Sequence, residues 1–333
     1  MAVKAYAVKA AKGKLEPFEY DPGPLGPHEV EVKVEYCGIC HSDLAMIDDD
    51  WGTSAYPLVP GHEVVGTVAK VGADVEGLEV GRRVGLGWQC GSCSRCEWCG
   101  RGLESLCAKS QGTIVHHHGG WAERVRTHWK FAVPLPEALD PAVAGPLMCA
   151  GSTVFTPMKR FGVEPWMRTA VLGIGGLGHL AVQFLSAFGC EVTAISSTHD
   201  KDDQAKALGA DRFLATRGTD ELKGAANSFD FIIATVSGDV PWADYIAALR
   251  PQGRLVIVGI PDEDIKFPAM PLLVEKSVTG GSAGPPADAA TMLDFAARAG
   301  VKPMTELFPM ADVNQAVDHV RAGKARFRAV LSA

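Results

Sequence analysis

The 333-residue sequence contains no long block of charge of one sign. Its 32 basic and 39 acidic side chains are interspersed and give a net charge of -7, which argues against a nucleic-acid-binding surface. The opening residues, Met1 to Tyr6, lack the apolar core of a signal peptide, and no internal repeat or low-complexity tract is visible. These absences predict a soluble cytoplasmic protein that binds neither nucleic acid nor membrane.

Cysteine is too scarce for a secreted disulfide framework, yet five of the nine cysteines lie between Cys90 and Cys107. In a reducing compartment such clustering indicates metal binding more often than disulfides. Four thiolates follow a Cys-x2-Cys-x2-Cys-x7-Cys pattern: Cys93, Cys96, Cys99 and Cys107. Because four sulfur ligands complete a tetrahedral zinc and leave no position for water, the pattern predicts a structural zinc site.

Cys90 leaves the ligand count of this loop open, because it continues the same spacing toward Cys93. An iron–sulfur cluster uses such a series, but the further Cys-Pro that usually accompanies it is missing. Unliganded thiols are the other alternative. We expect zinc, with Cys90 as a spare thiol and with Cys37 and Cys190 as ordinary buried thiols.

The length of the chain exceeds the size at which one hydrophobic core stops growing, which predicts two domains. The first section looks mostly β, with alternating apolar and polar residues over 29–36 and with β-rich pieces broken by glycine over 64–72 and 81–86. From about residue 150 strands alternate with helical stretches, which is typical of βαβ units on a parallel sheet. The expected strands of this section are 192–195, 229–233, 254–258 and 277–279, and its expected helices are 202–208 and 242–249. The tail, with helices over 287–299 and 311–322 and a last strand over 327–331, is expected to return to the first domain.

A glycine-rich turn stands between the apolar run 169–172 and a helix-like stretch over 179–185. Its residues are Gly173, Gly175, Gly176, Leu177 and Gly178, with Ile174 as the second. Gly173 permits the tight turn, Gly175 lets the backbone approach a pyrophosphate, and Gly178 lets the helix pack closely on the strand. Free N–H groups at the helix start attract negative charge. The turn predicts a dinucleotide site; a membrane span, which the glycines would interrupt, and a plain turn are the alternatives.

Three further segments carry potential metal ligands: Cys40 in CGICHSD, His62 and Glu63 in GHE, and Cys149 in PLMCAGST. Each alone is more typical of a buried thiol or a satisfied polar group. Two sulfurs and one imidazole would leave one position of a tetrahedral zinc open, and a Lewis-acid catalyst needs an open position. Beside a dinucleotide turn, this set indicates hydride transfer to a carbonyl.

Taken in order, these motifs resemble the zinc-dependent medium-chain alcohol dehydrogenases over essentially the whole chain. The sequence is most similar to the branch that contains cinnamyl alcohol dehydrogenases and bacterial broad-range aldehyde reductases. The resemblance implies an α/β fold in which a doubly wound Rossmann domain over 150–284 is joined to a GroES-like, mostly β catalytic domain. That catalytic domain would comprise residues 1–149 and 285–333 and include the structural zinc loop, about 90–107.

The resemblance also implies roles for individual residues. Cys40, His62 and Cys149 would ligate a catalytic zinc, with Glu63 beside the metal and able to approach it during ligand exchange. Asp43 would orient the histidine ligand.

Two neighbours of Cys40 match further family positions. Ser42 would transfer the proton, and His41 would lie near the phosphates of the cofactor. Many relatives continue the proton relay through a histidine at the position of Ala45, so proton exit here needs another route. The acids Asp48, Asp49 and Asp50 are nearby candidates, although such a run is more often solvated.

The cofactor is expected to be NADP(H) rather than NAD(H). NAD-selective turns usually carry an acid about twenty residues after the glycines, which holds the ribose 2′-hydroxyl. Ser196 and Ser197 occupy that place, and Lys201 follows. Hydroxyl donors and a cation suit a 2′-phosphate, although Asp200 keeps NAD open as an alternative.

Trp51 and Trp88 are candidates to line the substrate cleft, with a role in the domain core as the alternative. In the cleft they would favour aromatic or medium-chain aldehydes over sugars. The run His116, His117 and His118 is expected to be an exposed loop, because adjacent residues rarely converge on one ion.

The prediction is therefore a zinc-dependent, NADP(H)-linked alcohol dehydrogenase that works as an aldehyde reductase with two zinc ions per chain. The resemblance suggests a homodimer joined through the edges of the cofactor-domain sheets. An NAD-dependent alcohol dehydrogenase, a zinc-free quinone or enoyl reductase and a non-catalytic dinucleotide-binding protein are the alternatives.

Overall fold

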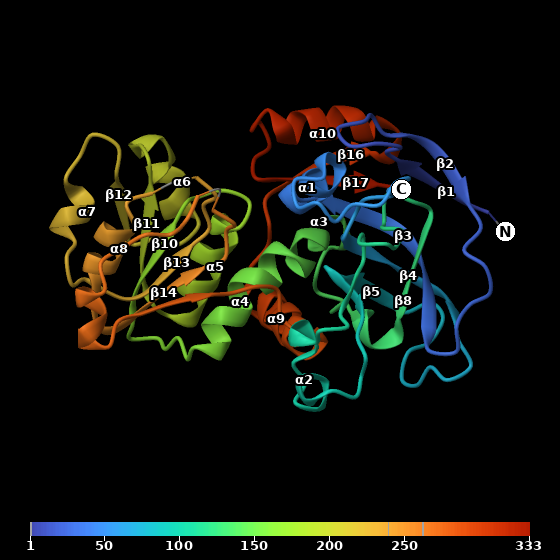
Figure 1. Ribbon diagram of the computed structural model, residues 1–333, viewed down its shortest axis with the longest axis horizontal. Helices are drawn as coiled ribbons and strands as arrows, with labels where there is room; N and C mark the ends of the chain where they lie inside the picture. The colour runs from blue at the N-terminus through green and yellow to red at the C-terminus, as the bar shows by residue number, and fades with distance from the viewer. Residues whose placement is uncertain (1, 239, 262) are drawn as a thin grey trace. The chain divides into compact units, whose positions relative to one another are not determined.

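The computed structural model describes residues 2–238, 240–261 and 263–333. The chain divides into two compact units. Unit 1 comprises Met1–Cys149, Gly284–Arg298 and Lys302–Ala333, and unit 2 comprises Ala150–Ala283 and Ala299–Val301. The blue N-terminal and red C-terminal segments in Figure 1 both belong to unit 1.

Unit 2 is built on a parallel sheet whose six strands lie in the order β12-β11-β10-β13-β14-β15. The strands are β10 (Arg168–Leu172), β11 (Glu191–Ser196), β12 (Arg212–Ala215), β13 (Phe229–Ala234), β14 (Leu249–Ile257) and β15 (Ser277–Gly280). Counted along the chain this order is 3-2-1-4-5-6, the order of doubly wound dinucleotide-binding sheets, which confirms the predicted Rossmann fold. The strand order reverses between β10 and β13, where ligands bind in such sheets.

The central strands β10, β11 and β13 are buried along nearly their whole length, as expected for a parallel sheet covered on both faces. The helices of this unit are α4 (Ala150–Arg160), α5 (Gly178–Phe188), α6 (Asp202–Ala207), α7 (Glu221–Gly224) and α8 (Trp242–Ala248), with 3-10 helices η4 (His199–Lys201) and η5 (Met270–Val274). The helices expected over 202–208 and 242–249 are confirmed as α6 and α8.

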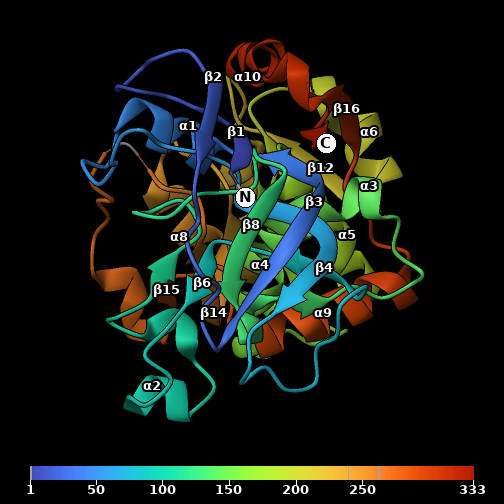
Figure 2. The same cartoon turned by 90° about the vertical axis from the view of Figure 1, so that its right-hand side faces the viewer.

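Unit 1 is built on a mixed sheet in the order β16-β17-β3-β4-β5-β9, with β8 also paired to β3. The strands are β3 (Glu29–Ile39), β4 (Glu63–Val71), β5 (Arg83–Leu86), β8 (Arg124–His128), β9 (Val133–Pro134), β16 (Thr305–Pro309) and β17 (Arg328–Ser332). Figure 2 shows β8, β3 and β4 side by side at the front of this unit. All pairs are antiparallel except β16 with β17, so the predicted mostly β character of this section is confirmed.

The remaining elements of unit 1 are short sheets and helices around this framework. Two-stranded sheets are formed by β1 (Val3–Ala7) with β2 (Glu16–Tyr20) and by β6 (Gln89–Gly91) with β7 (Gln111–Gly112). The α-helices are α1 (His41–Asp48), α2 (Glu97–Gly100), α3 (Pro141–Ala144), α9 (Pro286–Ala299) and α10 (Val313–Arg321). The 3-10 helices are η1 (Glu104–Leu106), η2 (Trp129–Phe131), η3 (Gly145–Met148) and η6 (Met310–Asp312).

One core in unit 1 unites the sheet with α1 and α10. Val32 and Val64 of the sheet, Met46 of α1 and Val313 of α10 are completely buried in it, and so is Trp121. Complete burial of one such large apolar side chain stabilises the fold by roughly 1.5–3 kcal/mol. This shared core fixes α10, which is late in the chain, against α1, which follows Cys40.

Strand β3 departs from the simple alternation that its sequence predicts. Glu31, expected on the solvent face, is only 2% exposed. Although burial alone would raise the pKa of Glu31, hydrogen bonds from Lys70, Arg124 and Arg126 lower it to about 2. Three basic side chains on neighbouring elements therefore make the buried charge tolerable.

No helix among the described residues combines the length and the apolar content that crossing a bilayer requires.

Candidate functional site

Four potential metal ligands from distant parts of the chain converge in unit 1: Cys40, His62, Glu63 and Cys149. One ligand atom from each lies within 4.8 Å of the others, and the Sγ atoms of Cys40 and Cys149 are 3.8 Å apart. All but Cys149 are buried. The structure thus brings together the set that the sequence analysis placed around one ion.

The local sequence positions each of these ligands. Cys40 directly follows β3 and caps the start of α1, where its N–H donates to Asp43 Oδ2 at 2.9 Å. Gly61 has a φ of +99°, and a Cβ there would lie 2.4 Å from the Trp121 ring, so only glycine fits before His62. Cys149 directly follows η3.

Asp43 orients the ring of His62. Its carboxylate is fully buried, and Oδ1 lies 2.9 Å from His62 Nδ1 and accepts the Gly61 N–H at 2.9 Å. Although burial alone would lower the pKa of His62, the charge of Asp43 raises it well above its usual value. Because Nδ1 faces Asp43, Nε2 is left as the nitrogen that can ligate a metal. Among the described residues this buried Nε2 has no hydrogen-bond partner.

The two thiols form one titrating pair. The hydrogen bond from Cys149 holds the pKa of Cys40 well below its usual value, while the same contact raises the pKa of Cys149. A divalent cation would remove the remaining proton, because thiolates are the metal-binding form. Two sulfurs and one buried imidazole nitrogen without a partner therefore fit a zinc ion with one open position.

Arg328 is a residue of this site that the sequence analysis missed. It is the first residue of β17, is 5% exposed and donates from Nη2 to Oε1 of Glu63. Burial raises the pKa of Glu63 to about 7 despite the opposing charge of Arg328. Oε2 of Glu63 has no hydrogen-bond partner among the described residues. Arg328 thus engages one carboxylate oxygen and leaves the other available to a cation.

Gly38 makes room for this carboxylate. It pairs with Glu63 between β3 and β4, and a Cβ at position 38 would lie 2.0 Å from Oε2. A glycine in a strand interior is unfavourable unless a close approach requires it. At Gly38 the group that approaches the backbone is the Glu63 side chain.

The start of α1 carries the other family positions near Cys40. His41 is exposed, Ser42 is half-buried two residues after the ligand, and Ala45 is only 3% exposed in the core. Because Ala45 is buried and has no proton-carrying group, no relay runs through position 45.

The acidic run after α1 is held in place rather than simply solvated. The carboxylate of Asp48 forms a bidentate ion pair with Arg321, at 2.5 and 2.8 Å, and Asp49 Oδ1 accepts the Ser54 N–H at 3.0 Å. Asp50 is exposed. The expectation of solvated acids is therefore wrong for Asp48, and its pairing also makes it unsuitable as a proton carrier.

Two tryptophans lie beside His62. The Trp88 ring meets the His62 ring edge to face at a centroid distance of 5.1 Å, and the Trp51 ring meets Trp88 at 5.9 Å. Trp51 is 37% exposed and Trp88 is partly buried. The rings form a continuous aromatic surface from a zinc-ligand position outward.

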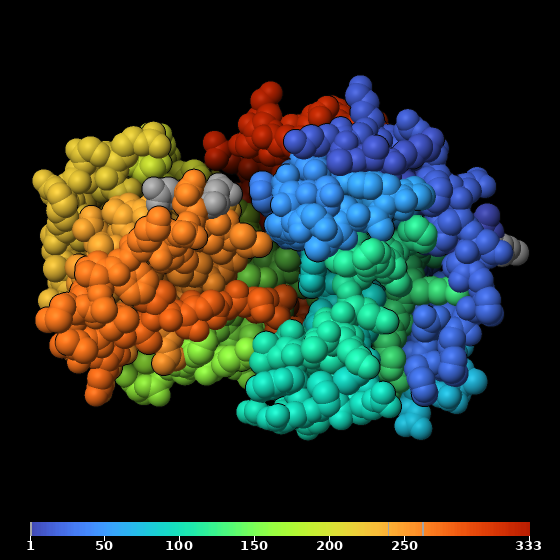
Figure 3. All heavy atoms as spheres, viewed as in Figure 1, coloured from blue at the N-terminus to red at the C-terminus, as the bar shows by residue number. Residues whose placement is uncertain are grey.

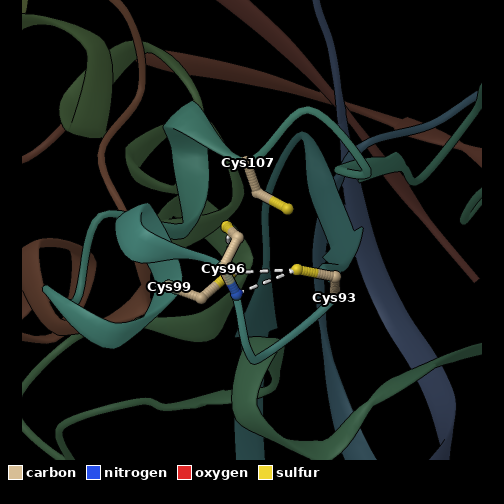
Figure 4. Close-up of side chains that lie close together, drawn as sticks. All are labelled: Cys93, Cys96, Cys99 and Cys107. Atoms are coloured by element: carbon tan, nitrogen blue, oxygen red, sulfur yellow. Dashed lines mark hydrogen bonds between the residues drawn. The ribbon is translucent and has the colours of Figure 1, made fainter.

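A second metal-type group lies in the loop around α2. The thiols of Cys93, Cys96, Cys99 and Cys107 lie within 4.8 Å of one another. Figure 4 shows their sulfur atoms pointing toward a common centre, and Figure 3 shows this teal loop at the surface of unit 1. The N–H groups of Arg95 and Cys96 lower the pKa of Cys93 to about 6, which favours its thiolate. Four sulfurs at this spacing fit a closed, structural zinc site.

Cys90 lies outside this group, as expected. It is buried, and burial raises its pKa to about 12. Cys37 and Cys190 are also buried. Of the histidine run only His116 is exposed. The His118 ring packs at a tilt against Tyr20, with a centroid distance of 4.1 Å, so the run is less open than predicted.

The glycine-rich turn of unit 2 follows β10 and opens into α5. Gly173 has a φ of +89°, a Cβ at Gly178 would lie 1.8 Å from the Gly173 carbonyl oxygen, and a Cβ at Gly175 would meet nothing within 4 Å. Gly176 and Leu177 complete the turn before the helix. The turn therefore combines a tight bend with an open face at Gly175, which fits a pyrophosphate at the helix N-terminus.

The residues expected around the ribose lie at the end of β11. Ser196 ends that strand, Ser197 is exposed, and Lys201 donates from Nζ to the Ile174 carbonyl in the glycine turn at 2.8 Å. The N–H of Arg217 donates to the Ser197 carbonyl at 2.9 Å. This backbone hydrogen bond joins the segment after β12 to the end of β11.

Comparison with known families matches both units. Residues 26–137 match the alcohol dehydrogenase GroES-like domain, and residues 176–298 match the zinc-binding dehydrogenase family.

Individual proteins are similar over nearly the full length. An aldehyde reductase from Synechocystis sp. is 50% identical over 99% of this chain and 98% of its own. Cinnamyl alcohol dehydrogenase 2 from Rauvolfia serpentina is 40% identical over 99% and 95%. Among solved structures, a cinnamyl alcohol dehydrogenase from Sorghum bicolor has a TM-score of 0.95 at 38% identity, covering 100% of this chain and 98% of its own. CAD from Helicobacter pylori, complexed with NADP(H), has a TM-score of 0.92 at 27% identity with the same coverage.

Proposed function

We propose that this chain, which belongs to the zinc-dependent medium-chain alcohol dehydrogenases, reduces aromatic and medium-chain aldehydes with NADPH. It is an oxidoreductase of alcohol and aldehyde pairs, in the branch of cinnamyl alcohol dehydrogenases and bacterial aldehyde reductases. The convergence of Cys40, His62 and Cys149, with His62 Nε2 free to ligate, is the observation that carries the proposal.

Each chain would hold two zinc ions. Cys40, His62 and Cys149 would hold the catalytic ion with Glu63 beside it, and the four loop cysteines would hold the structural one. When bound, zinc supplies a Lewis acid for the carbonyl oxygen and NADPH supplies the hydride. The chain positions the ligands through Asp43 and keeps one oxygen of Glu63 engaged by Arg328.

Ser42 would deliver the proton to the substrate oxygen. It stands two residues after Cys40 and is half-buried. Because position 45 is a buried alanine and Asp48 is paired with Arg321, we propose that the proton reaches Ser42 from the cofactor ribose or from water.

Preference for NADP(H) is supported by the residues at the end of β11. Ser196 and Ser197 stand where an acid would repel a 2′-phosphate, and Lys201 reaches back to the glycine turn. Gly175 offers the open approach that the pyrophosphate needs, and we place His41 near the phosphates by its family position. The relative from Helicobacter pylori was solved with NADP(H).

We expect kcat/KM for NADPH to exceed that for NADH by about 10- to 100-fold in aldehyde reduction, the effect of one or two charge-assisted hydrogen bonds. Steady-state rates with each cofactor measure this ratio. Lys201→Ala should reduce the ratio, whereas Lys206→Ala, which removes an exposed lysine of α6 paired with Asp202, should not. Equal specificity constants for the two cofactors in the parent would refute the assignment.

Trp51 and Trp88 would form one wall of the substrate site. Their rings meet edge to face and extend from His62, and they offer an apolar surface that suits an aromatic or medium aliphatic aldehyde. A sugar would leave its many hydroxyl groups without partners against these rings.

A homodimer would use the outer edge of β15. This strand ends the sheet of unit 2, and an unpaired strand edge is a template for another strand. Met270 and Leu273 of the preceding η5 are 74% and 76% exposed, which a second copy would cover. We expect light scattering to give twice the 35.3 kDa of one chain, and Leu273→Asp to shift the mass toward one chain. A parent that runs as a monomer at micromolar concentration would contradict the dimer.

A further inference from the structure

The turn that follows α1 is tied to the C-terminal helix. Arg321, the last residue of α10, donates from Nη1 and Nη2 to the two carboxylate oxygens of Asp48 at 2.5 and 2.8 Å. The Asp48 side chain is 13% exposed and that of Arg321 is 38% exposed. A bidentate, partly shielded pair fixes geometry better than a single surface contact does.

Hydrogen bonds within the turn connect its residues to one another. Asp49 adopts the left-handed conformation, with a φ of 58°, and its Oδ1 accepts the Ser54 N–H. Ser54 Oγ donates to the Met46 carbonyl at 2.6 Å, and the Tyr56 hydroxyl donates to the Ile47 carbonyl at 3.0 Å. These hydrogen bonds connect residues within 46–56 to one another, and the Arg321 contact joins that segment to another part of unit 1.

Helix α10 provides a fixed support for Arg321. Val313, Ala316 and Val317, at helical spacing, are buried in the same core as Met46. Asn314 holds the helix start to Leu15 by two hydrogen bonds, Leu15 N–H to Oδ1 at 3.1 Å and Nδ2 to the Leu15 carbonyl at 3.0 Å. An arginine at the end of such a helix can hold its partner in a defined position.

Trp51, three residues beyond Asp48, is the side chain that the turn presents. Its ring meets Trp88, which meets the ligand-position residue His62. Trp51 is 37% exposed, so contacts of its side chain alone do not fix the ring. The position of the ring therefore depends on where the backbone of the turn lies.

We propose that the ion pair between Arg321 and Asp48 is a specificity determinant that holds Trp51 in place as a wall of the substrate site. Arg321 is a positioning residue, remote from the reacting atoms. The proposal rests on the proposed function, in which Trp51 and Trp88 contact the aldehyde. A wall fixed in advance binds a flat ring without first having to be ordered, whereas a small aldehyde gains little from it.

Arg321→Met tests the role of the ion pair, because it keeps an apolar side chain and removes the guanidinium group that binds both oxygens of Asp48. We expect KM for benzaldehyde to rise about fivefold, in line with the cost of ordering one side chain on binding. For acetaldehyde KM should stay within about twofold, and kcat should stay near that of the parent for both substrates. Arg321→Lys, which keeps the charge without the guanidinium group, should give an intermediate KM.

Arg298→Met is the matched control, because Arg298 forms an exposed pair with Asp294 on α9. It should leave both KM values unchanged. An Arg321→Met enzyme that loses zinc, or whose KM rises equally for the two aldehydes, would overturn the proposal in favour of a merely structural role.

The double variant separates the role of the ion pair from the proposed function. In a Trp51→Ala background, Arg321→Met should cause no further change in the benzaldehyde-to-acetaldehyde ratio, because coupled residues are not additive. If Trp51→Ala changes the ratio and Arg321→Met does not, the role of the ion pair is refuted and the substrate assignment stands. If Trp51→Ala leaves the benzaldehyde-to-acetaldehyde ratio unchanged, the role of Arg321 and the role of Trp51 in the substrate site are both refuted.

The position of Trp51 can also be tested by a measurement that needs no substrate. Acrylamide quenching of tryptophan fluorescence, compared with a Trp51→Phe background, isolates the signal of Trp51. We expect Arg321→Met to increase quenching of that signal, and unchanged quenching would contradict the release of Trp51.

Discussion

Cys149→Ala is expected to lower kcat for aldehyde reduction by at least about 10³-fold, the scale of losing the electrostatic stabilisation of a developing oxyanion. The substitution removes one of the three ligands proposed for the catalytic ion and leaves a single sulfur, Cys40, beside His62. Zinc content should fall from two ions per chain to one. NADPH binding should persist, because the glycine turn belongs to unit 2. Steady-state rates, metal analysis and NADPH fluorescence titration measure the three quantities.

Cys190→Ala is the matched control for this experiment. Cys190 is a buried thiol of unit 2 outside both metal groups, so its removal should keep two zinc ions and full turnover. Retained turnover in Cys149→Ala would refute the assignment of the catalytic metal. A parent that holds one ion per chain, in the four-cysteine loop, would favour a non-catalytic dinucleotide-binding protein.

Cys107→Ala is expected to lower the apparent melting temperature by about 10 °C, the shift that follows from losing a structural metal worth several kcal/mol in a domain of this size. The loop between β6 and β7 buries few side chains, since α2 and η1 contain no buried residue. Because apolar burial contributes little there, the proposed zinc supplies most of the order. Thermal unfolding and metal analysis test this, with one zinc ion expected to remain.

Cys90→Ala provides the comparison for the loop. Cys90 is also buried but lies outside the four-thiol group, so its removal should keep both ions and shift the melting temperature by less than about 5 °C. Equal zinc loss in the two variants would show that Cys90 is a ligand. An unchanged melting temperature in Cys107→Ala would show that the loop orders without metal.

The sequence predicts the parts of this molecule that local spacing encodes. The turn from Gly173 to Gly178 is recognisable in the sequence because its glycines serve local needs within six residues, such as the positive φ at Gly173 and the 1.8 Å approach at Gly178. The four loop cysteines lie within fifteen residues, so their spacing alone limits where the sulfurs can go. For Cys40, His62 and Cys149 the family resemblance was needed, since nothing local brings them together.

The residues that the sequence could not predict are those whose partners lie far along the chain. Arg328 and Glu63 are 265 positions apart, and Arg321 and Asp48 are 273 apart. From the sequence alone a charged side chain is expected to be exposed to solvent, because its partner is known only once the chain is folded. The expectation that Glu31 is exposed was wrong for the same reason, because the arginines that make its burial tolerable lie on β8.

The place of Arg328 in the chain has a consequence for biosynthesis. During translation Cys40, His62, Glu63 and Cys149 all leave the ribosome well before the strand β17 that carries Arg328. Pairing of β17 with β3 brings Arg328 to Oε1 of Glu63, so a residue from the end of the chain engages one of the two carboxylate oxygens. The basic partner of this carboxylate is therefore the last part of the site to be synthesised.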